Sequence, residues 1–157
     1  MQNLLTLPAN SIDMPPDFYL SFEQICQKNG FDVLKYSVTT EDSYVLGNFR
    51  IRSKTFKAGS PAVFFQHGLF DTSDTWIINA PAVAPAFQMA RAGYDVYLGN
   101  NRGNYYSNKN LYLDPITDNK EFHDYSFTKY GKYDLTAQVQ TALNMSGRQK
   151  LTYIGHS

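Results

Sequence analysis

The pattern of apolar and polar side chains divides the chain into strands and helices that alternate. Residues 34–39 alternate between apolar and polar side chains, which predicts a half-buried strand, and residues 44–51 predict a second strand that forms a hairpin with it. Residues 62–65 are a short continuous apolar run, typical of a central strand covered on both faces, and residues 95–98 predict a further strand. Residues 151–154 predict the last strand.

Helical signals lie before and between these strands. A short helix is expected after Ser21, a second between residues 85 and 93, and a third from about residue 126 or 132 to residue 145. The third helix has an apolar stripe of Leu135, Val139, Ala142 and Leu143. A polar loop is expected over residues 70–75, and residues 105–125 predict an extended excursion with a short helical turn.

This alternation of strands and helices predicts the α/β class, with right-handed crossovers. The sheet is expected to be mostly parallel, with an antiparallel hairpin at its start. Residues 1–20, which contain Pro8, Pro15 and Pro16, predict an irregular leader, and residues 21–157 predict one domain.

Charge, cysteine count and the absence of certain motifs narrow the expected partners and cofactors. The formal net charge of the 157 residues is zero, which gives no indication of a nucleic-acid partner. Cys26 is the single cysteine, so an intrachain disulfide is excluded; it is either a buried apolar residue or a partner for a cysteine elsewhere. No metal-ligand spacing and no glycine-rich phosphate loop is present, so we expect no metal and no cofactor. No signal peptide is visible, and localisation stays open.

Two short motifs carry the candidate chemistry. The chain ends in Gly155-His156-Ser157 after a strand, which is the front half of the Gly-x-Ser-x-Gly turn that presents a nucleophilic serine. The strand at residues 62–65 runs into His67-Gly68-Leu69, where a loop of this kind supplies one backbone N–H of an oxyanion hole. The order of the two motifs and the elements between them fit one active site.

The sequence resembles the acid lipase family of the α/β-hydrolase fold, which includes gastric and lysosomal acid lipases and related sterol-ester hydrolases. The resemblance covers residues 22–157 and is carried by residues 36–46, Gln66-His67-Gly68-Leu69 with Trp76 and Asn79 downstream, residues 92–104 and residues 127–135. Ser43 stands where this family commonly has glycine, and Asn101 stands where serine is usual. The chain is thus expected to be the amino-terminal part of an α/β-hydrolase fold, ending at the nucleophile.

The resemblance implies hydrolysis of lipid esters, either triacylglycerols or sterol esters, in lipid catabolism. The substrate would be a lipid ester, with transient contact to a lipid surface in the full-length parent, and the family is commonly secreted or lysosomal. The implied catalytic groups are Ser157 as nucleophile and the Leu69 backbone N–H as oxyanion donor, supported by Gly155, His156, His67 and Gly68.

The chain order of the fold limits which residues can complete the catalytic triad, because the acid and the histidine come after the serine. His67, His123, His156 and Asp134 all precede Ser157, so we expect the chain to lack the catalytic Asp and His and to be inactive alone.

Arg102 is expected to form an ion pair that stabilises its loop, and Trp76 to pack in the core. The alternatives are a non-catalytic truncated remnant, with a binding role or none, and an acyltransferase; Ser157 argues against epoxide hydrolases and dehalogenases, which usually use aspartate.

Overall fold

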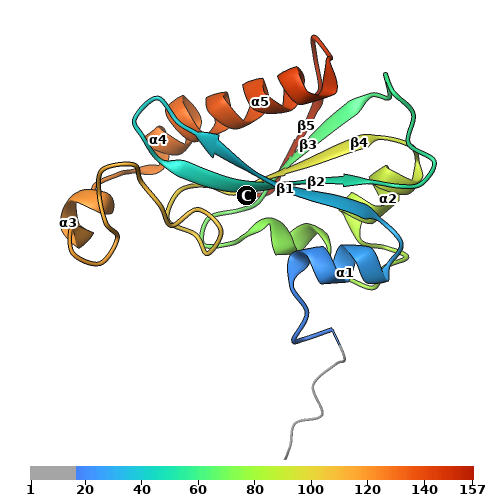
Figure 1. Cartoon of the computed structure of the whole chain (residues 1–157), viewed down its shortest axis with the longest axis horizontal. Helices are drawn as coiled ribbons and strands as arrows, with labels where there is room; N and C mark the ends of the chain where they lie inside the picture. The colour runs from blue at the N-terminus through green and yellow to red at the C-terminus, as the bar shows by residue number, and fades with distance from the viewer. Residues whose placement is uncertain (1–16) are drawn as a thin grey trace, which may run out of the picture.

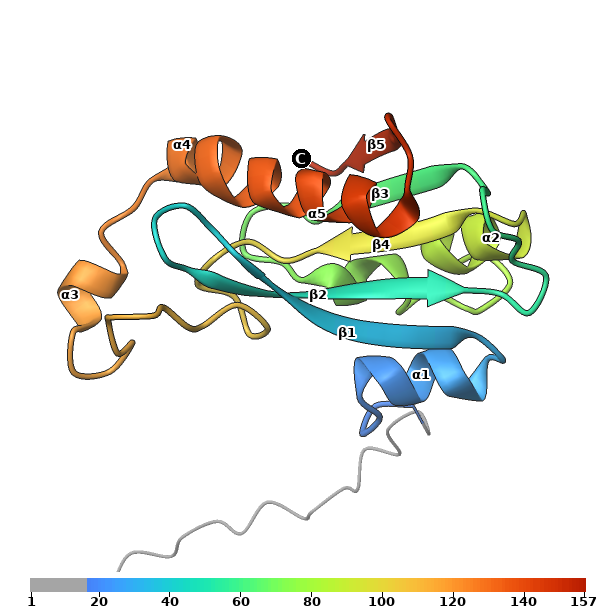
Figure 2. The same cartoon turned by 45° about the horizontal axis from the view of Figure 1, so that its top comes forward.

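The computed structural model describes residues 17–157, which form one sheet with helices on both faces (Figures 1 and 2). The strands are β1 (Asp32–Thr39), β2 (Val45–Arg52), β3 (Ala62–Gln66), β4 (Asp95–Gly99) and β5 (Thr152–Gly155). The helices are α1 (Phe22–Lys28), α2 (Pro85–Arg91), α3 (Asn119–Phe122), α4 (Phe127–Lys129) and α5 (Thr136–Ser146). A 3₁₀ turn, η1 (Ser73–Trp76), and a π-helical segment, η2 (Tyr130–Leu135), complete the set. Of the expected leader, residues 1–20, all but residues 17–20 lie outside the described part of the chain.

The sheet confirms the α/β class and the antiparallel hairpin at its start. Its strand order is β1-β2-β4-β3-β5. The pairs β4–β3 and β3–β5 are parallel, as expected, and β1–β2 is the antiparallel hairpin. Because β2 also pairs antiparallel with β4, the sheet is mixed, and the expectation of a mostly parallel sheet holds for its β4-β3-β5 side.

Alternate side chains of β3 point into two different hydrophobic cores, one on each face of the sheet. Val63 and Phe65 join the larger cluster, with Phe49, Phe87 and Leu98, under α1 and α2. Ala62 and Phe64 face the opposite side, where they pack with Tyr97 and with Ala142 of α5. Figure 2 shows α5 on one side of the sheet and α1 and α2 on the other. A strand covered on both faces reads as a continuous apolar run, which is why β3 could be recognised from its sequence.

The helix termini follow the local signals of the sequence. Ser21 caps α1 with a full capping box, in which the Gln24 side chain bonds back to the Ser21 N–H. Pro85 occupies the first turn of α2, and Gly147, at φ +66°, ends α5 in the left-handed conformation. The loop expected over residues 70–75 overlaps η1, a turn too short to leave an apolar periodicity. Cys26 is fully buried in the larger cluster, and burial raises the pKa of its thiol to about 12.

The third helix differs from the expected regular α-helix. It begins as α4 after Ser126, widens into η2, and becomes α-helical again at Thr136. The side chains at the centre of its buried face are Asp134, Gln138 and Ala142, each four residues apart. Leu135 and Val139 of the expected stripe are only half-buried beside them, and Leu143 lies outside that cluster. The polar residues on this face have partners in the loops that form the site.

Ser43, in the turn of the β1–β2 hairpin, has a backbone conformation that favours glycine. Its φ is +75°, in the left-handed region, where a side chain costs about 1–2 kcal/mol. We therefore expect Ser43→Gly to raise the free energy of unfolding by about 0.5–1 kcal/mol, after the extra chain entropy of glycine is subtracted. Urea denaturation would measure the change. Ser60→Gly, at a loop position without positive φ, is the control and should not stabilise; a Ser43→Gly variant no more stable than the parent would contradict the strain.

Candidate active site

The two candidate motifs meet at the same edge of the sheet. β3 and β5 are parallel neighbours, with Gln66 in register with Gly155, so the loops that follow them leave side by side. The His156 N–H donates to the Gln66 carbonyl at 3.1 Å and extends this pairing by one residue. His67-Gly68-Leu69 and His156-Ser157 are therefore adjacent, although Gly68 and His156 are 88 positions apart in the sequence.

Gly68 and Ser157 are in close contact. A Cβ added to Gly68 would lie 3.0 Å from His156 Nδ1, 3.2 Å from Ser157 Cβ and 3.3 Å from the His156 carbonyl oxygen. A side chain at Gly68 would thus press on the turn that carries the serine. Ser157 has a φ of +67°, the left-handed conformation typical of a strained nucleophile turn. His156 is exposed and packs edge-on against Trp76 at 6.5 Å between ring centroids.

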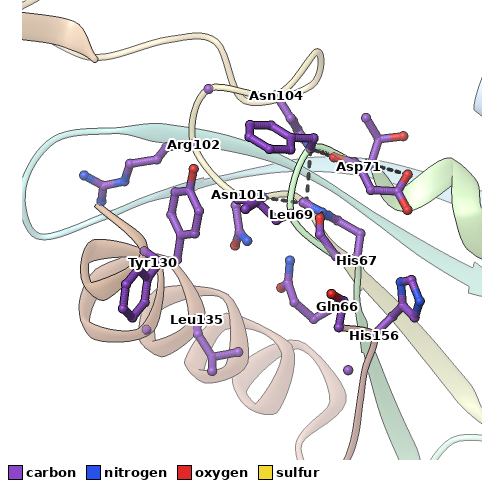
Figure 3. A pocket seen from close by; sticks show the side chains of 18 of the residues that line it. Gln66, His67, Leu69, Asp71, Asn101, Arg102, Asn104, Tyr130, Leu135 and His156 are labelled. Carbon is purple, nitrogen blue, oxygen red and sulfur yellow. Dashed lines mark hydrogen bonds between the residues drawn. The ribbon is translucent and has the colours of Figure 1, made fainter. Parts of the chain in front are cut away.

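A cavity of about 1100 Å³ opens over this edge, and Figure 3 shows its lining. The residues that line it include Ser157, His67 and Gln66. Its apolar lining includes Leu69, Phe70, Phe127, Leu135 and Tyr153. Leu69 is 61% exposed and Phe70 is 99% exposed, so the loop after β3 presents two large apolar side chains to solvent at the rim. Within residues 17–157 the Leu69 N–H donates no hydrogen bond, and it stays available to a ligand.

His67 is buried and has one tautomer imposed on it. Its Nε2 lies 3.1 Å from the Asn101 backbone nitrogen, which can only donate, and 3.2 Å from Asn104 Nδ2. Its Nδ1 lies 2.7 Å from the Gly68 carbonyl oxygen, which can only accept. Nε2 is therefore the unprotonated acceptor and Nδ1 carries the hydrogen. Burial lowers the pKa of His67 below its ordinary value, in opposition to the Gly68 carbonyl and the Asp71 carboxylate.

The loop after β4 is held in place by a fully buried asparagine. Asn100 Oδ1 accepts from the Ser73 N–H at 2.9 Å, and Asn100 Nδ2 donates to the Gly47 carbonyl at 2.8 Å. The Asn100 N–H donates to Gln138 Oε1 of α5 at 2.9 Å. Asn100 therefore ties together η1, β2 and α5, and fixes the start of the segment that contacts His67.

Arg102, in the same loop, forms the ion pair that the sequence predicts. Its guanidinium contacts Asp134 of η2 and Asp42 of the hairpin turn, both at 2.7 Å. The guanidinium carbon, Cζ, also lies 3.9 Å from the centroid of the Tyr44 ring. The Arg102 side chain is 1% exposed and that of Asp134 is fully buried. Burial opposes the charge, but the hydrogen bonds to the two carboxylates raise the pKa of Arg102 above its ordinary value.

Two further polar residues of this region, Gln66 and Gln138, have positions to which the sequence alone assigned no role. Gln66 and Gln138 face each other across Gly99, where an added Cβ would lie 2.6 Å from the Oε1 atom of each. Both are buried, and both atoms of the Gln66 amide and Nε2 of Gln138 have no partner within residues 17–157. Neither a Gln at the end of an apolar strand nor one within a helix is a distinctive local signal.

The remaining candidates lie apart from the serine. His123 is exposed, lies at the rim of the cavity, and bonds through Nδ1 to the Asn119 carbonyl at 2.8 Å. Asp134 is engaged by Arg102, which makes it structural rather than a surface residue. In residues 17–157 no hydrogen bond joins the Ser157 hydroxyl to a histidine. The same residues contain no group of three His, Cys, Asp or Glu placed to share a metal ion, and no helix with the length and apolar character that crossing a membrane requires.

Comparisons with known proteins match both halves of the chain. Residues 61–157 match the family model described as alpha/beta hydrolase fold, and residues 22–80 match the one described as partial alpha/beta-hydrolase lipase region. The chain is 40% identical to the gastric triacylglycerol lipase of Rattus norvegicus over 146 residues, and 42% identical to the lipase lipl-1 of Caenorhabditis elegans over 150 residues. These alignments cover 90% and 92% of this chain but 36% of each relative, so the chain spans about a third of their length.

Solved structures share the fold at low sequence identity. An esterase from Pyrococcus furiosus superposes with a TM-score of 0.56 at 18% identity, over 82% of this chain and 44% of that one. A structure described as a putative lipase from Sulfolobus solfataricus gives a TM-score of 0.59 at 14% identity, over 82% of this chain and 38% of that one.

Proposed function

Because the chain belongs to the α/β-hydrolase family, and its amino-terminal region matches the lipase members of that family, we propose that it forms part of a lipid-ester hydrolase in which Ser157 is the nucleophile. Ser157 Oγ attacks the ester carbonyl, the alcohol leaves, and water releases the fatty acid from the acyl-enzyme. The Leu69 N–H stabilises the negative charge that develops on the carbonyl oxygen. Triacylglycerols and sterol esters are the substrate classes we propose.

One observation carries this proposal: the Leu69 loop and Ser157 lie side by side at the rim of a large, mostly apolar cavity. A Cβ added to Gly68 would lie 3.2 Å from Ser157 Cβ, and the Leu69 N–H has no partner in residues 17–157; both observations support a site in which this N–H acts beside the Ser157 hydroxyl. The exposed Leu69 and Phe70 side chains at the rim suit transient contact with a lipid surface.

The general base is proposed to lie outside residues 17–157. In this fold the acid and the histidine follow the nucleophile in the sequence, and no described histidine contacts the Ser157 hydroxyl. A serine without a base is almost entirely protonated at neutral pH and is a weak nucleophile. The polypeptide of residues 1–157 by itself is therefore proposed to be inactive.

The test is an assay of the whole protein on emulsified triolein and cholesteryl oleate, combined with labelling by a fluorophosphonate. Release of oleate, together with mass-spectrometric location of the label at Ser157, supports the proposal, and the ratio of the two rates identifies the preferred ester. Transfer of oleate to an added alcohol in preference to water would indicate an acyltransferase. A whole protein that neither labels nor releases oleate would be a non-catalytic remnant.

A further inference from the structure

The peptide that joins Gly68 to Leu69 contains both the candidate oxyanion donor and the acceptor of the His67 hydrogen bond. A trans peptide is planar, so its C=O and N–H point in opposite directions. The Gly68 carbonyl oxygen accepts from His67 Nδ1 at 2.7 Å and from the Asp71 N–H at 3.2 Å. Because these two donors fix the direction of the carbonyl, they also fix the direction of the Leu69 N–H.

His67 can hold this carbonyl only while its Nδ1 carries the hydrogen. The Asn101 N–H and Asn104 Nδ2 both face Nε2, and they leave no room for a hydrogen on that atom. Asn104 Nδ2 also lies 2.9 Å from Asn100 Oδ1, which is itself fully buried, so the amide is oriented with its nitrogen toward the histidine. The loop after β4 thus sets the tautomer that the loop after β3 requires.

We propose that His67 is a positioning residue that aims the Leu69 N–H at the reacting carbonyl oxygen, and that Asn101 and Asn104 act through it by holding the Nδ1–H tautomer. The inference rests on the proposed function, because it assigns a role within that same site. Hydrogen bonds in a chain polarise one another, so a donor on the Gly68 carbonyl also strengthens the Leu69 N–H as a donor. No proton moves in this arrangement.

A simpler role for His67 would be to tie the two loops together through Nε2, without any effect on the direction of the peptide. Two substitutions of similar size separate these roles. Asparagine places its Nδ2 the same number of bonds from Cα as His67 Nδ1, so it can keep the donor to Gly68 but not the acceptor. Glutamine places its Oε1 as far from Cα as Nε2, so it can keep the acceptor for Asn101 and Asn104 but not the Nδ1–H donor.

The experiment is steady-state kinetics of the whole protein and its His67→Asn and His67→Gln variants on a soluble short-chain ester. Positioning of the oxyanion donor predicts that His67→Gln lowers kcat by roughly 10- to 100-fold with little change in KM. This loss is smaller than the ~10²–10³-fold typical when one donor is removed, because the Leu69 N–H is still present but misdirected. His67→Asn is expected to retain a several-fold higher kcat than His67→Gln. A simple tie between the loops predicts the reverse order, with His67→Asn the more damaged variant, and that result would overturn the proposal.

A second measurement does not depend on activity. Nitrogen-15 NMR of the histidine side chains in the whole protein, with the His67 signals assigned from their loss in His67→Asn, reports which ring nitrogen carries the hydrogen. We expect the Nδ1–H tautomer at neutral pH and a partial shift toward Nε2–H in Asn104→Ala. An Nε2–H tautomer in the parent protein would refute the proposed positioning role of His67 even if the enzyme is active. A protein that shows the Nδ1–H tautomer but hydrolyses no ester would keep the geometry and refute the proposed function.

Discussion

Alanine at position 157 is expected to lower the rate of ester hydrolysis by the whole protein by about 10⁶-fold, the order of magnitude measured when a hydrolase loses its nucleophilic serine. The substitution removes one oxygen atom, and it leaves the contact between Gly68 and the Cβ of residue 157 unchanged. The loss should therefore appear in kcat, without unfolding and with little change in substrate binding. Single-turnover release of the alcohol from a chromogenic ester would measure it.

Ser157→Gly is the matched variant for the backbone at this position. It also lacks the nucleophile, but glycine adopts the φ of +67° without strain. We expect Ser157→Gly to be as inactive as Ser157→Ala and more stable than it by about 1 kcal/mol. Substantial hydrolysis by either variant would show that the reaction does not proceed through Ser157.

Arg102→Met is expected to lower the free energy of unfolding by about 3–5 kcal/mol, the usual cost of removing one partner from a buried ion pair. Asp134 is fully buried and would keep its charge without its partner, or take up a proton at a cost. The Asp42 carboxylate and the Tyr44 ring would lose the same guanidinium. Urea denaturation of the parent and the variant would measure the change.

Two further variants make this measurement specific to the buried charge. Arg148→Met removes an exposed guanidinium that makes no side-chain hydrogen bond in the described residues, and it should change stability by less than about 0.5 kcal/mol. Arg102→Met combined with Asp134→Leu removes both buried charges and should recover part of the loss, because an apolar pair of similar volume replaces the ions. If Arg102→Met lowers the free energy of unfolding by less than about 1 kcal/mol, the ion pairs of Arg102 with Asp134 and Asp42 are not essential to the fold.

The elements that were predicted correctly are those whose signal is local. The capping box at Ser21 and the left-handed Gly147 are each set by a few neighbouring residues, and so is the continuous apolar run of β3. The two candidate motifs could also be recognised, because each follows directly from a strand. Their placement at one sheet edge then follows from the parallel pairing of β3 and β5.

What the sequence did not reveal depends on contacts between distant segments. Asp42 reads as an ordinary turn residue, and only the fold brings it to Arg102, 60 residues later. The tautomer of His67 is set by donors from the loop after β4, which no local pattern specifies. Asp134 and Gln138 interrupt an apolar helix face, and their burial makes sense only once Arg102 and Asn100 are in place.

The π-helical segment η2 makes the position of a deletion in this part of the chain as important as its size. A widened turn accommodates one residue that a regular α-helix would not, whereas an α-helix turns by about 100° per residue. A chain one residue shorter between Lys129 and Thr136 could therefore close into an unbroken α-helix in which α4 and α5 keep the directions they face. A residue deleted from α5 has no such turn to absorb it, so everything before the deletion would rotate by about that angle relative to the rest of α5. Tyr130, which lines the cavity, and Asp134, which holds Arg102, would then turn away from the face that α5 buries. Related chains should therefore tolerate a one-residue deletion in η2 more readily than one in α5.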